Sequence, residues 1–319
     1  MRYTNLNGNG LDLKVSKLAM GTDKLALSLT DTEFFYLLDI FTDAGGNFID
    51  TARVYSGGKS EEAIGRWLQK TGKRSKIVLS SKGCHPPIDD MSQSRLAKKD
   101  MEYDLNLSLK ALKTDCIDMY WLHRDDLSRT VDEIVETINT FIKEGKIKMA
   151  GCSNWYSDRI EQANKYAAEK GLCGFSSSQI QWSLAHTTEE IYQDYAIVIM
   201  DEKEYKYYVS STLPVFAYAP LAQGFSPKVA EGGLEALSEK TRNRFGSEDN
   251  LKRLELLKVF AAIHGMSLSA ASLLYITCNR LSAVPIIGSR TPLQLLESLE
   301  AADVIITEEE ADQLYYLDK

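Results

Sequence analysis

Cysteine is scarce in this chain: there are five among 319 residues, and no two of them form a C-x-x-C pair. Scattered cysteines in odd number argue against a disulfide framework and against a structural zinc site. Long apolar runs are absent too, since no stretch approaches the ~18 residues that a membrane-spanning helix needs. The opening MRYTNLNGNGLDLKV is polar and lacks the apolar core of a signal peptide. We therefore expect a cytoplasmic protein.

Basic residues are in deficit, with 37 Lys and Arg against 45 Asp and Glu, for a formal net charge of -8. An acidic chain without a long basic run is poorly suited to coat nucleic acid or an anionic membrane, so we expect neither partner. Hydrophobic residues make up 44% of the chain and charged residues 26%, which is enough to bury a sizeable core. The length allows one large barrel or two mid-sized domains.

Short apolar runs recur along the chain, each of the length typical of a buried parallel strand. They follow a polar opening, residues 2–13, whose Asn-Gly-Asn-Gly turn at 7–10 predicts a small hairpin. The eight predicted strands are 17–20, 47–50, 76–80, 116–122, 148–152, 178–181, 214–218 and 283–287.

Amphipathic stretches at helical spacing separate these runs. The clearest cover residues 32–44, 61–70 with Ser60 as the N-cap, 94–112, 130–144 and 158–170. Eight units of strand then helix predict an α/β fold, a (β/α)8 TIM barrel with an N-terminal β-hairpin, as a single domain over residues 1–319. A doubly wound open sheet is the alternative, and the lack of a GxGxxG motif after the first strand disfavours it.

One polar segment, residues 223–250, is long for a connection between a strand and a helix. It follows the seventh predicted strand, on the face where barrel active sites lie. Loops of this length are often functional lids, and a tolerated surface insertion is the equally open alternative.

Polar side chains fall at or near the carboxyl ends of the predicted strands, which converge on one mouth in a parallel barrel. Tyr55 lies five residues past the second of these ends. Singly, each has an ordinary explanation as a helix cap, a packing residue or a core histidine, but the combination indicates a site. The residues at these ends are Asp50, Lys82, His123, Asn154 and Gln179.

Five blocks of sequence carry a resemblance to the aldo-keto reductase family: FIDTARVYSGGKSEEAIGRWL, IVLSSK, DMYWLHRDD, IKEGKIKMAGCSNW and AVPIIGSRTPLQLLESL. They stand in the family's order and extend over essentially the whole chain. The resemblance implies a (β/α)8 barrel that reduces small carbonyl compounds with NAD(P)H and without a metal. It also implies the catalytic residues Asp50, Tyr55, Lys82 and His123.

Those four residue types suit carbonyl reduction on chemical grounds as well. The reaction needs a hydride at carbon and a proton at oxygen, and a tyrosine hydroxyl with a pKa of about 10 is a weak proton donor. We expect the Lys82 ammonium to lower the pKa of Tyr55, and Asp50 to hold that ammonium. His123 would orient the carbonyl oxygen. A structural Asp–Lys pair beside a packed tyrosine and histidine is the alternative.

The resemblance also implies the cofactor contacts. Ser153, Asn154 and Gln179 would bind the nicotinamide carboxamide, and Tyr218 would stack on the ring. Arg290 would pair with a 2′-phosphate, which favours NADP(H) over NAD(H). The remaining implied contacts are Gly21, Thr22, Gly288, Ser289, Gln294 and Glu297. An exposed arginine beside a helix cap, and a tyrosine that packs the barrel, are the structural alternatives for Arg290 and Tyr218.

The pocket neighbours predict an apolar, partly aromatic mouth formed by Val54, His85 and Trp155, suited to aryl or medium aliphatic aldehydes. Asp23 stands where an aromatic residue is common in the family, which predicts a more polar wall there. A regulatory or redox-sensing NADP(H)-binding subunit is the second interpretation, and a barrel acting on a phosphorylated metabolite the third. We expect a monomer, because no coiled coil or long apolar edge is evident.

Overall fold

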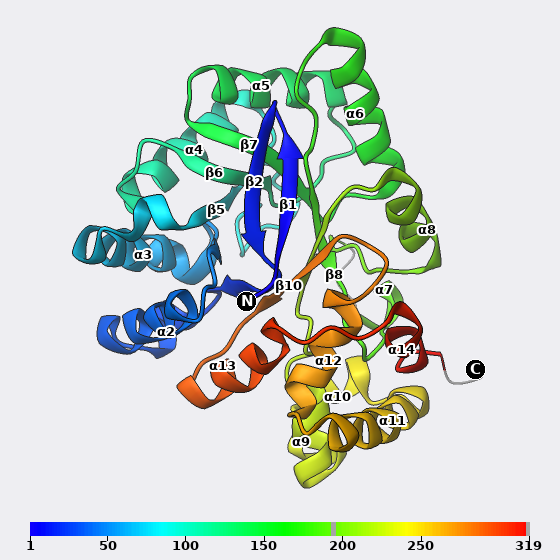
Figure 1. Ribbon diagram of the computed structural model, residues 1–319. Helices are drawn as coiled ribbons and strands as arrows, with labels where there is room; N and C mark the ends of the chain where they lie inside the picture. Colours follow the sequence, from blue (N-terminus) through cyan, green and yellow to red (C-terminus); the bar gives the residue numbers. More distant parts are fainter. Residues whose placement is uncertain (193–195, 317–319) are drawn as a thin grey trace.

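The computed structural model describes residues 1–192 and 196–316, and its centre is a closed barrel of eight parallel strands (Figure 1). Each strand pairs with the strand that precedes it in the barrel, and Ile286 and Ile287 of the last pair with Ala19 and Met20 of the first to close it. The predicted TIM barrel is thus confirmed. Its strands are β3 (Ala19–Gly21), β4 (Phe48–Asp50), β5 (Val78–Gly83), β6 (Ile117–Leu122), β7 (Ile147–Ser153), β8 (Ser178–Gln181), β9 (Val215–Tyr218) and β10 (Ala283–Ile287).

The strands are short and almost entirely buried, because apolar side chains fill the barrel on one face and pack against helices on the other. Inside, the rings of Phe48 and Phe216 lie 4.6 Å apart between centroids, and Trp121 meets Phe216 edge-on at 5.2 Å. This aromatic layer blocks the lumen, so the barrel is a packed core and any chemistry has to take place at one of its ends.

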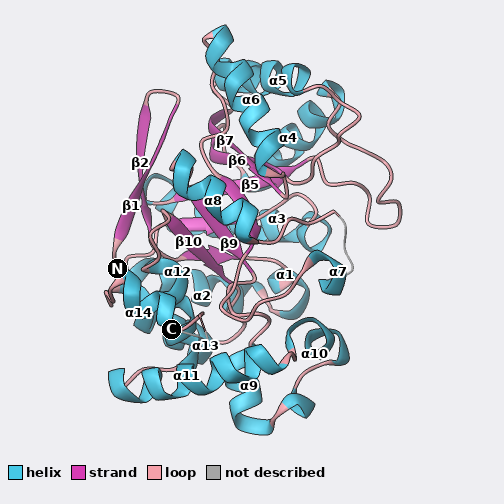
Figure 2. Cartoon of the chain, turned by 90° about the vertical axis from the view of Figure 1, so that its right-hand side faces the viewer, coloured by secondary structure: helices cyan, strands magenta, loops and turns pink. Residues whose placement is uncertain are grey.

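A hairpin of β1 (Tyr3–Gly8) and β2 (Leu11–Ser16) covers one end of the barrel, as the sequence predicts. Leu6 and Val15 are fully buried and belong to the same apolar cluster as Phe48 and Trp121. Figure 2 shows the hairpin on the left of the barrel strands, and α1 and α7 on the opposite side. The other end, where the strands finish, is left for the site.

Helices surround the barrel (Figure 1). Those that follow the barrel strands closely match the predicted amphipathic stretches, although α4 begins at Lys98 and not at residue 94. The helices are α1 (Leu25–Ser28), α2 (Asp31–Asp43), α3 (Lys59–Thr71), α4 (Lys98–Leu112), α5 (Val131–Lys143), α6 (Ser157–Lys170), α7 (Glu189–Tyr192), α8 (Glu202–Ser211), α9 (Phe225–Gly232), α10 (Glu239–Phe245), α11 (Glu248–His264), α12 (Leu268–Thr277), α13 (Pro292–Leu299) and α14 (Glu308–Gln313). Short 3-10 turns are η1 (Tyr55–Gly58), η2 (Lys73–Lys76), η3 (Leu234–Ala236) and η4 (Glu300–Ala302).

Two local expectations are wrong. Ser60 does not cap α3, because the helix begins at Lys59, two residues before the predicted start at 61. The residue before it is Gly58, in a left-handed conformation (φ 93°). The Ser60 hydroxyl instead donates to the Thr22 carbonyl at 3.1 Å. The polar segment 223–250 is no long loop but a run of short helices, α9, η3, α10 and the start of α11. Ser238 and Ser247 cap α10 and α11 through their side chains, which explains why a polar sequence is helical here.

Within residues 1–192 and 196–316, no single helix is long and apolar enough to cross a membrane. The bent pair of α11 and α12, which meet at 99°, passes the same test on length and composition. Every residue of α12 from Ser269 to Thr277 is buried against the barrel and the outer helices, which accounts for its apolar composition. All five cysteines lie in the described part of the chain, and none is in a disulfide.

Candidate active site

The site starts from a buried ion pair between two neighbouring strands. Asp50 ends β4, and Lys82 lies near the end of β5; both are essentially inaccessible to solvent. The Lys82 ammonium donates to Asp50 Oδ2 at 2.5 Å and to the Thr51 carbonyl at 2.9 Å. The other Asp50 oxygen accepts from the Ser80 hydroxyl at 2.7 Å and from Gln179 at 3.3 Å. Every charged atom of the pair is therefore hydrogen-bonded, as a buried pair requires.

Two rings cover this pair on the side of the mouth. Tyr55 lies on η1, and its ring centroid is 4.7 Å from the Lys82 ammonium. The His123 ring, at the end of β6, meets the Tyr55 ring edge-on with centroids 5.8 Å apart. His85 in turn lies 4.7 Å from His123. The structure thus brings Asp50, Tyr55, Lys82 and His123 together at one end of the barrel.

A second buried carboxylate, Glu61 of α3, holds the segments that carry Tyr55 and Lys82. Arg53 donates to Glu61 Oε2 at 2.6 Å, and the hydroxyl of Ser81 donates to Glu61 Oε1 at 2.6 Å. The Arg53 guanidinium lies directly under Gly58, where any Cβ would collide with it. Glu61, fully buried, therefore ties together the turn that bears Tyr55 and the strand that bears Lys82.

Burial governs the protonation of Tyr55. It raises the pKa of the Tyr55 hydroxyl well above its usual range, and the negative charges of Asp50 and Asp23 act in the same direction. Burial and the two carboxylates outweigh the lowering expected from the Lys82 ammonium, so the net shift of the Tyr55 pKa is upward, opposite to the expectation. Tyr55 keeps its proton at neutral pH, which is the state that a proton donor needs.

His123 is neutral for the same reason. Burial lowers its pKa well below the usual value, and the positive charges of Arg124 and Lys82 lower it further. Its Nδ1 atom is buried and has no hydrogen-bond partner among the described residues. A neutral ring that carries one N–H can donate to a carbonyl oxygen without bringing a charge into the site.

A pH prediction follows from these two directions. The pKa of His123 is lowered, so the ring stays neutral as the pH falls through the ordinary value of about 6.5. The pKa of Tyr55 is raised, so its hydroxyl stays protonated as the pH rises to about 9. We expect kcat/KM for a carbonyl substrate to change by less than about threefold between pH 6 and 9. Initial rates at constant ionic strength measure this, and an acid limb with a midpoint near 6.5 would contradict it.

The predicted nicotinamide contacts lie beside these residues. Asn154, in a left-handed conformation after β7, has a fully engaged amide group: it donates to Ser153 Oγ at 3.0 Å and to the His123 carbonyl at 3.4 Å. Its oxygen accepts from the Tyr218 hydroxyl at 2.7 Å and from the Val198 N–H at 3.2 Å. Gln179 bonds to Asp50 across the barrel. All four predicted residues thus meet at one side of the ion pair.

Gly21 ends β3 and Thr22 directly follows it, next to the same pair. Thr22 donates to the Asp50 carbonyl through both its N–H, at 3.1 Å, and its hydroxyl, at 3.0 Å. A Cβ on Gly21 would lie 2.8 Å from a methyl group of Ile286, so glycine allows β3 and β10 to approach closely. In this structure both residues support the barrel rim below the site.

The predicted phosphate contacts lie between β10 and α13. Thr291 caps α13, and the Gln294 side chain accepts from the Arg290 N–H at 2.9 Å. The Arg290 side chain is exposed, and no described residue forms an ion pair with it; Gly288 is exposed, Ser289 is buried, and Glu297 lies on α13 with partial exposure. An exposed guanidinium beside a capped helix start is a donor set that fits a phosphate group.

Some expectations about the mouth fail, and some site residues were missed. Trp155 does not line the mouth: it is fully buried, with its ring 5.0 Å from Phe175. Sequence reasoning missed Arg53 and Glu61, whose signal was a charged pair eight residues apart around the Tyr55 turn. It also missed Asp104, which accepts from the Cys84 N–H at 2.9 Å and so fixes the loop before His85.

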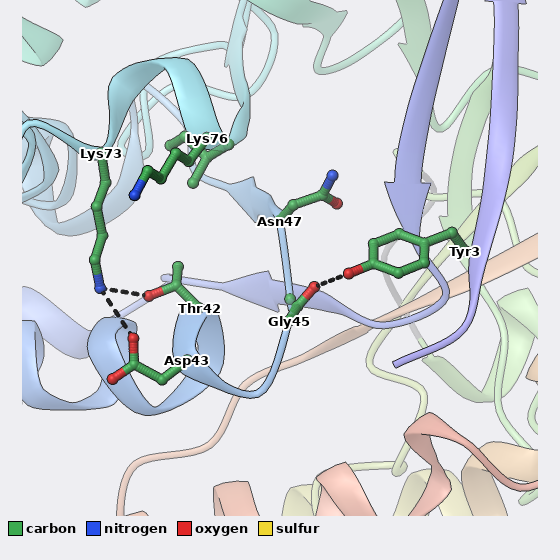
Figure 3. Close-up of a pocket in the computed structure, with 9 residues that line it drawn as sticks. Tyr3, Thr42, Asp43, Gly45, Asn47, Lys73 and Lys76 are labelled. Carbon is green, nitrogen blue, oxygen red and sulfur yellow. Dashed lines mark hydrogen bonds and ion pairs between the residues drawn. The ribbon is translucent and has the colours of Figure 1, made fainter.

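A cavity of about 330 Å³ lies at the far end of the barrel, away from this cluster. Figure 3 shows Tyr3, Thr42, Asn47 and Lys76 around it. Tyr3 begins β1, Thr42 belongs to α2, and Asn47 and Lys76 come shortly before β4 and β5. The Lys73 ammonium beside it is already bonded to Asp39, Thr42 and Asp43. Since active sites in TIM barrels lie at the carboxyl ends of the strands, we do not assign chemistry to this cavity.

Comparisons with known proteins agree with the geometry. The model of the Aldo/keto reductase family matches residues 17–319. The uncharacterized oxidoreductase YrpG of Bacillus subtilis is 30% identical over 97% of this chain and 93% of its own length. A probable voltage-gated potassium channel subunit beta of Oryza sativa is 30% identical over 98% and 95%.

Two further relatives bear on fold and activity. The norsolorinic acid reductase stcV of Emericella nidulans is 29% identical over 93% of this chain and 77% of its own length. The crystal structure of the thermostable aldo-keto reductase Tm1743 with the inhibitor epalrestat superposes with a TM-score of 0.75 at 22% identity, covering 98% of each chain. At that identity the likeness supports the barrel fold alone.

Proposed function

Because the chain belongs to the aldo/keto reductase family, whose members are NAD(P)H-dependent oxidoreductases that act on carbonyl groups, we propose that it reduces an aldehyde or ketone to the alcohol with NADPH. One observation supports this most strongly. The protonated Tyr55, the neutral His123 and the buried Asp50–Lys82 pair face one another at the carboxyl ends of neighbouring strands.

The roles follow from the protonation states. Tyr55 would donate its proton to the carbonyl oxygen, since burial keeps the hydroxyl protonated until a stronger base arrives. His123 would donate a hydrogen bond to the same oxygen and fix its position. Lys82, held by Asp50 under the Tyr55 ring, would stabilise the negative charge that develops as the proton leaves. A bound nicotinamide would supply the hydride to the carbonyl carbon.

The residues that would hold the cofactor lie at two places. Ser153, Asn154, Gln179 and Tyr218 would surround the nicotinamide. Because the Asn154 amide is already bonded at every position, we expect it to position its neighbours, with Ser153 and Gln179 making the direct contacts. The start of α13 with Arg290 would hold the phosphate end.

The test is NADPH oxidation, followed by the loss of absorbance at a wavelength where only the reduced cofactor absorbs. 4-Nitrobenzaldehyde serves as an activated neutral substrate, and NADH is run as the matched cofactor. Turnover with NADPH supports the proposal, and tight NADPH binding without turnover across a broad set of aldehydes and ketones refutes it.

Replacement of Arg290 by alanine tests the cofactor preference. The exposed guanidinium has no partner to lose within the described chain, so stability should not change. Loss of a charge-assisted bond to the 2′-phosphate should raise KM for NADPH about 10- to 100-fold and change KM for NADH by less than about threefold. An equal rise in KM for both cofactors would show that Arg290 does not bind the 2′-phosphate.

A regulatory subunit that binds NADP(H) without turnover is the second candidate. The observation in its favour is the relative of Oryza sativa, which matches this chain at the same identity as YrpG. Cofactor binding does not separate the two candidates, because both need it. The turnover experiment does.

A further inference from the structure

We propose that Arg124 selects carbonyl substrates that carry an anionic group, a carboxylate above all, at the end remote from the reacting carbon. The proposal rests on the proposed function and adds a substrate class to it. Arg124 directly follows His123 at the mouth end of β6, and it is absent from the catalytic roles described above.

The guanidinium is fixed beside the reacting groups. One of its terminal nitrogens donates to the carbonyl oxygen of His123 at 3.2 Å. Its Nε atom is buried and has no hydrogen-bond partner in residues 1–192 and 196–316. The side chain as a whole keeps part of its surface exposed, so it is accessible to a ligand from solvent.

The acids beside Arg124 in the sequence do not neutralise it. Asp125 pairs with Arg159 of α6, with Nε and Oδ2 3.2 Å apart. Asp126 lies 3.7 Å from Arg129 and also accepts from the Ser128 hydroxyl at 2.6 Å. No carboxylate in the described chain forms an ion pair with Arg124. A partly desolvated arginine without a carboxylate partner at the rim of a site suits an anion from outside.

The charges around the mouth favour one orientation of such a substrate. Asp50 and Lys82 cancel each other inside the site. Asp23, after β3, is exposed, and its negative charge acts on Tyr55 in the direction opposite to that of Arg124. The positive charge of Arg124 reaches both rings, since it acts on the protonation of Tyr55 and of His123. A substrate whose carbonyl meets these rings would therefore place an anionic tail toward β6.

The experiment compares two substrates of the same shape. 4-Carboxybenzaldehyde and 4-nitrobenzaldehyde differ in charge but not in outline, and their ratio of kcat/KM is measured with NADPH for the wild type, R124Q, R124K and R129Q. R129Q is the matched control, because it removes an arginine of the same loop that already forms ion pairs with Asp126 and Glu133. Taking the ratio cancels the different reactivity of the two aldehydes.

We expect the ratio to fall at least tenfold in R124Q, to fall less in R124K, and to stay within about twofold in R129Q. An equal loss for both substrates in R124Q, with an unchanged ratio, overturns the proposal. A melting temperature within a few degrees of the wild type shows that R124Q is folded.

Failure of the proposed function is a separate outcome, seen as no turnover of either aldehyde by the wild type. Arg124 is then tested by calorimetry on the protein loaded with NADP⁺. 4-Carboxybenzyl alcohol should bind at least tenfold more weakly to R124Q than to the wild type, relative to 4-nitrobenzyl alcohol. Equal changes for the two alcohols would overturn the proposal in that case as well.

Discussion

Replacement of Tyr55 by phenylalanine should lower kcat by about 10²- to 10⁴-fold, the range that a positioned proton donor contributes. The variant loses one oxygen and nothing else. The ring can still lie over the Lys82 ammonium, 4.7 Å from it, and still meet the His123 ring edge-on. Because the Tyr55 hydroxyl stays protonated in the folded site, its loss removes the proton source and not a structural charge.

Steady-state rates with 4-nitrobenzaldehyde and NADPH measure this effect, and cofactor binding measured by fluorescence should change little. Tyr156→Phe is the matched control, because this exposed tyrosine donates its hydroxyl to Glu189, away from the ion pair. A Tyr55→Phe enzyme that retains more than a tenth of the wild-type kcat would show that the proton comes from elsewhere.

Replacement of Lys82 by methionine should both destabilise the fold and abolish activity. The change leaves the Asp50 carboxylate fully buried without its cation, and breaking a buried pair in this way costs about 3–5 kcal/mol of unfolding free energy. Urea unfolding at neutral pH measures the loss. Activity should fall because nothing then stabilises the tyrosinate that forms as the proton leaves.

The double variant Asp50→Asn/Lys82→Met separates the two effects. Asparagine can still accept from the Ser80 hydroxyl but carries no charge to leave unpaired, so most of the lost stability should return. Activity should not return. If the two single variants were additive in unfolding free energy, Asp50 and Lys82 would not be coupled in the folded state.

Much of the barrel was predictable because its strands are short, apolar and buried on both faces. The predicted runs at 178–181 and 283–287 coincide with β8 and β10, and the others differ by one to three residues. Asp50, Lys82 and His123 were predictable because parallel strands end at one face, so residues at strand ends meet without any knowledge of packing. Tyr55 lies past a strand end, on η1, and the resemblance to the family implied its role.

Tertiary packing explains what the sequence did not reveal. The low mean apolarity of 223–250 suggested a loop, yet serine caps and a few buried side chains such as Phe225 and Phe245 make it helical. Trp155 looked like a pocket residue by its place after Asn154, but its side chain points into the core. The raised pKa of Tyr55 depends on the burial of its hydroxyl in the folded protein, which no local pattern encodes.

The Glu61 carboxylate also bears on how this enzyme could be altered. Because it bonds to both Arg53 and Ser81, changes at those positions are coupled, and neither can be varied alone without disturbing both segments of the site. Side chains such as Val54 and Asp23 have no such tie. Mutant libraries aimed at a new substrate range should therefore leave Glu61, Arg53 and Ser81 unchanged. They should vary Val54 and Asp23, whose replacement does not break the hydrogen bonds of Glu61.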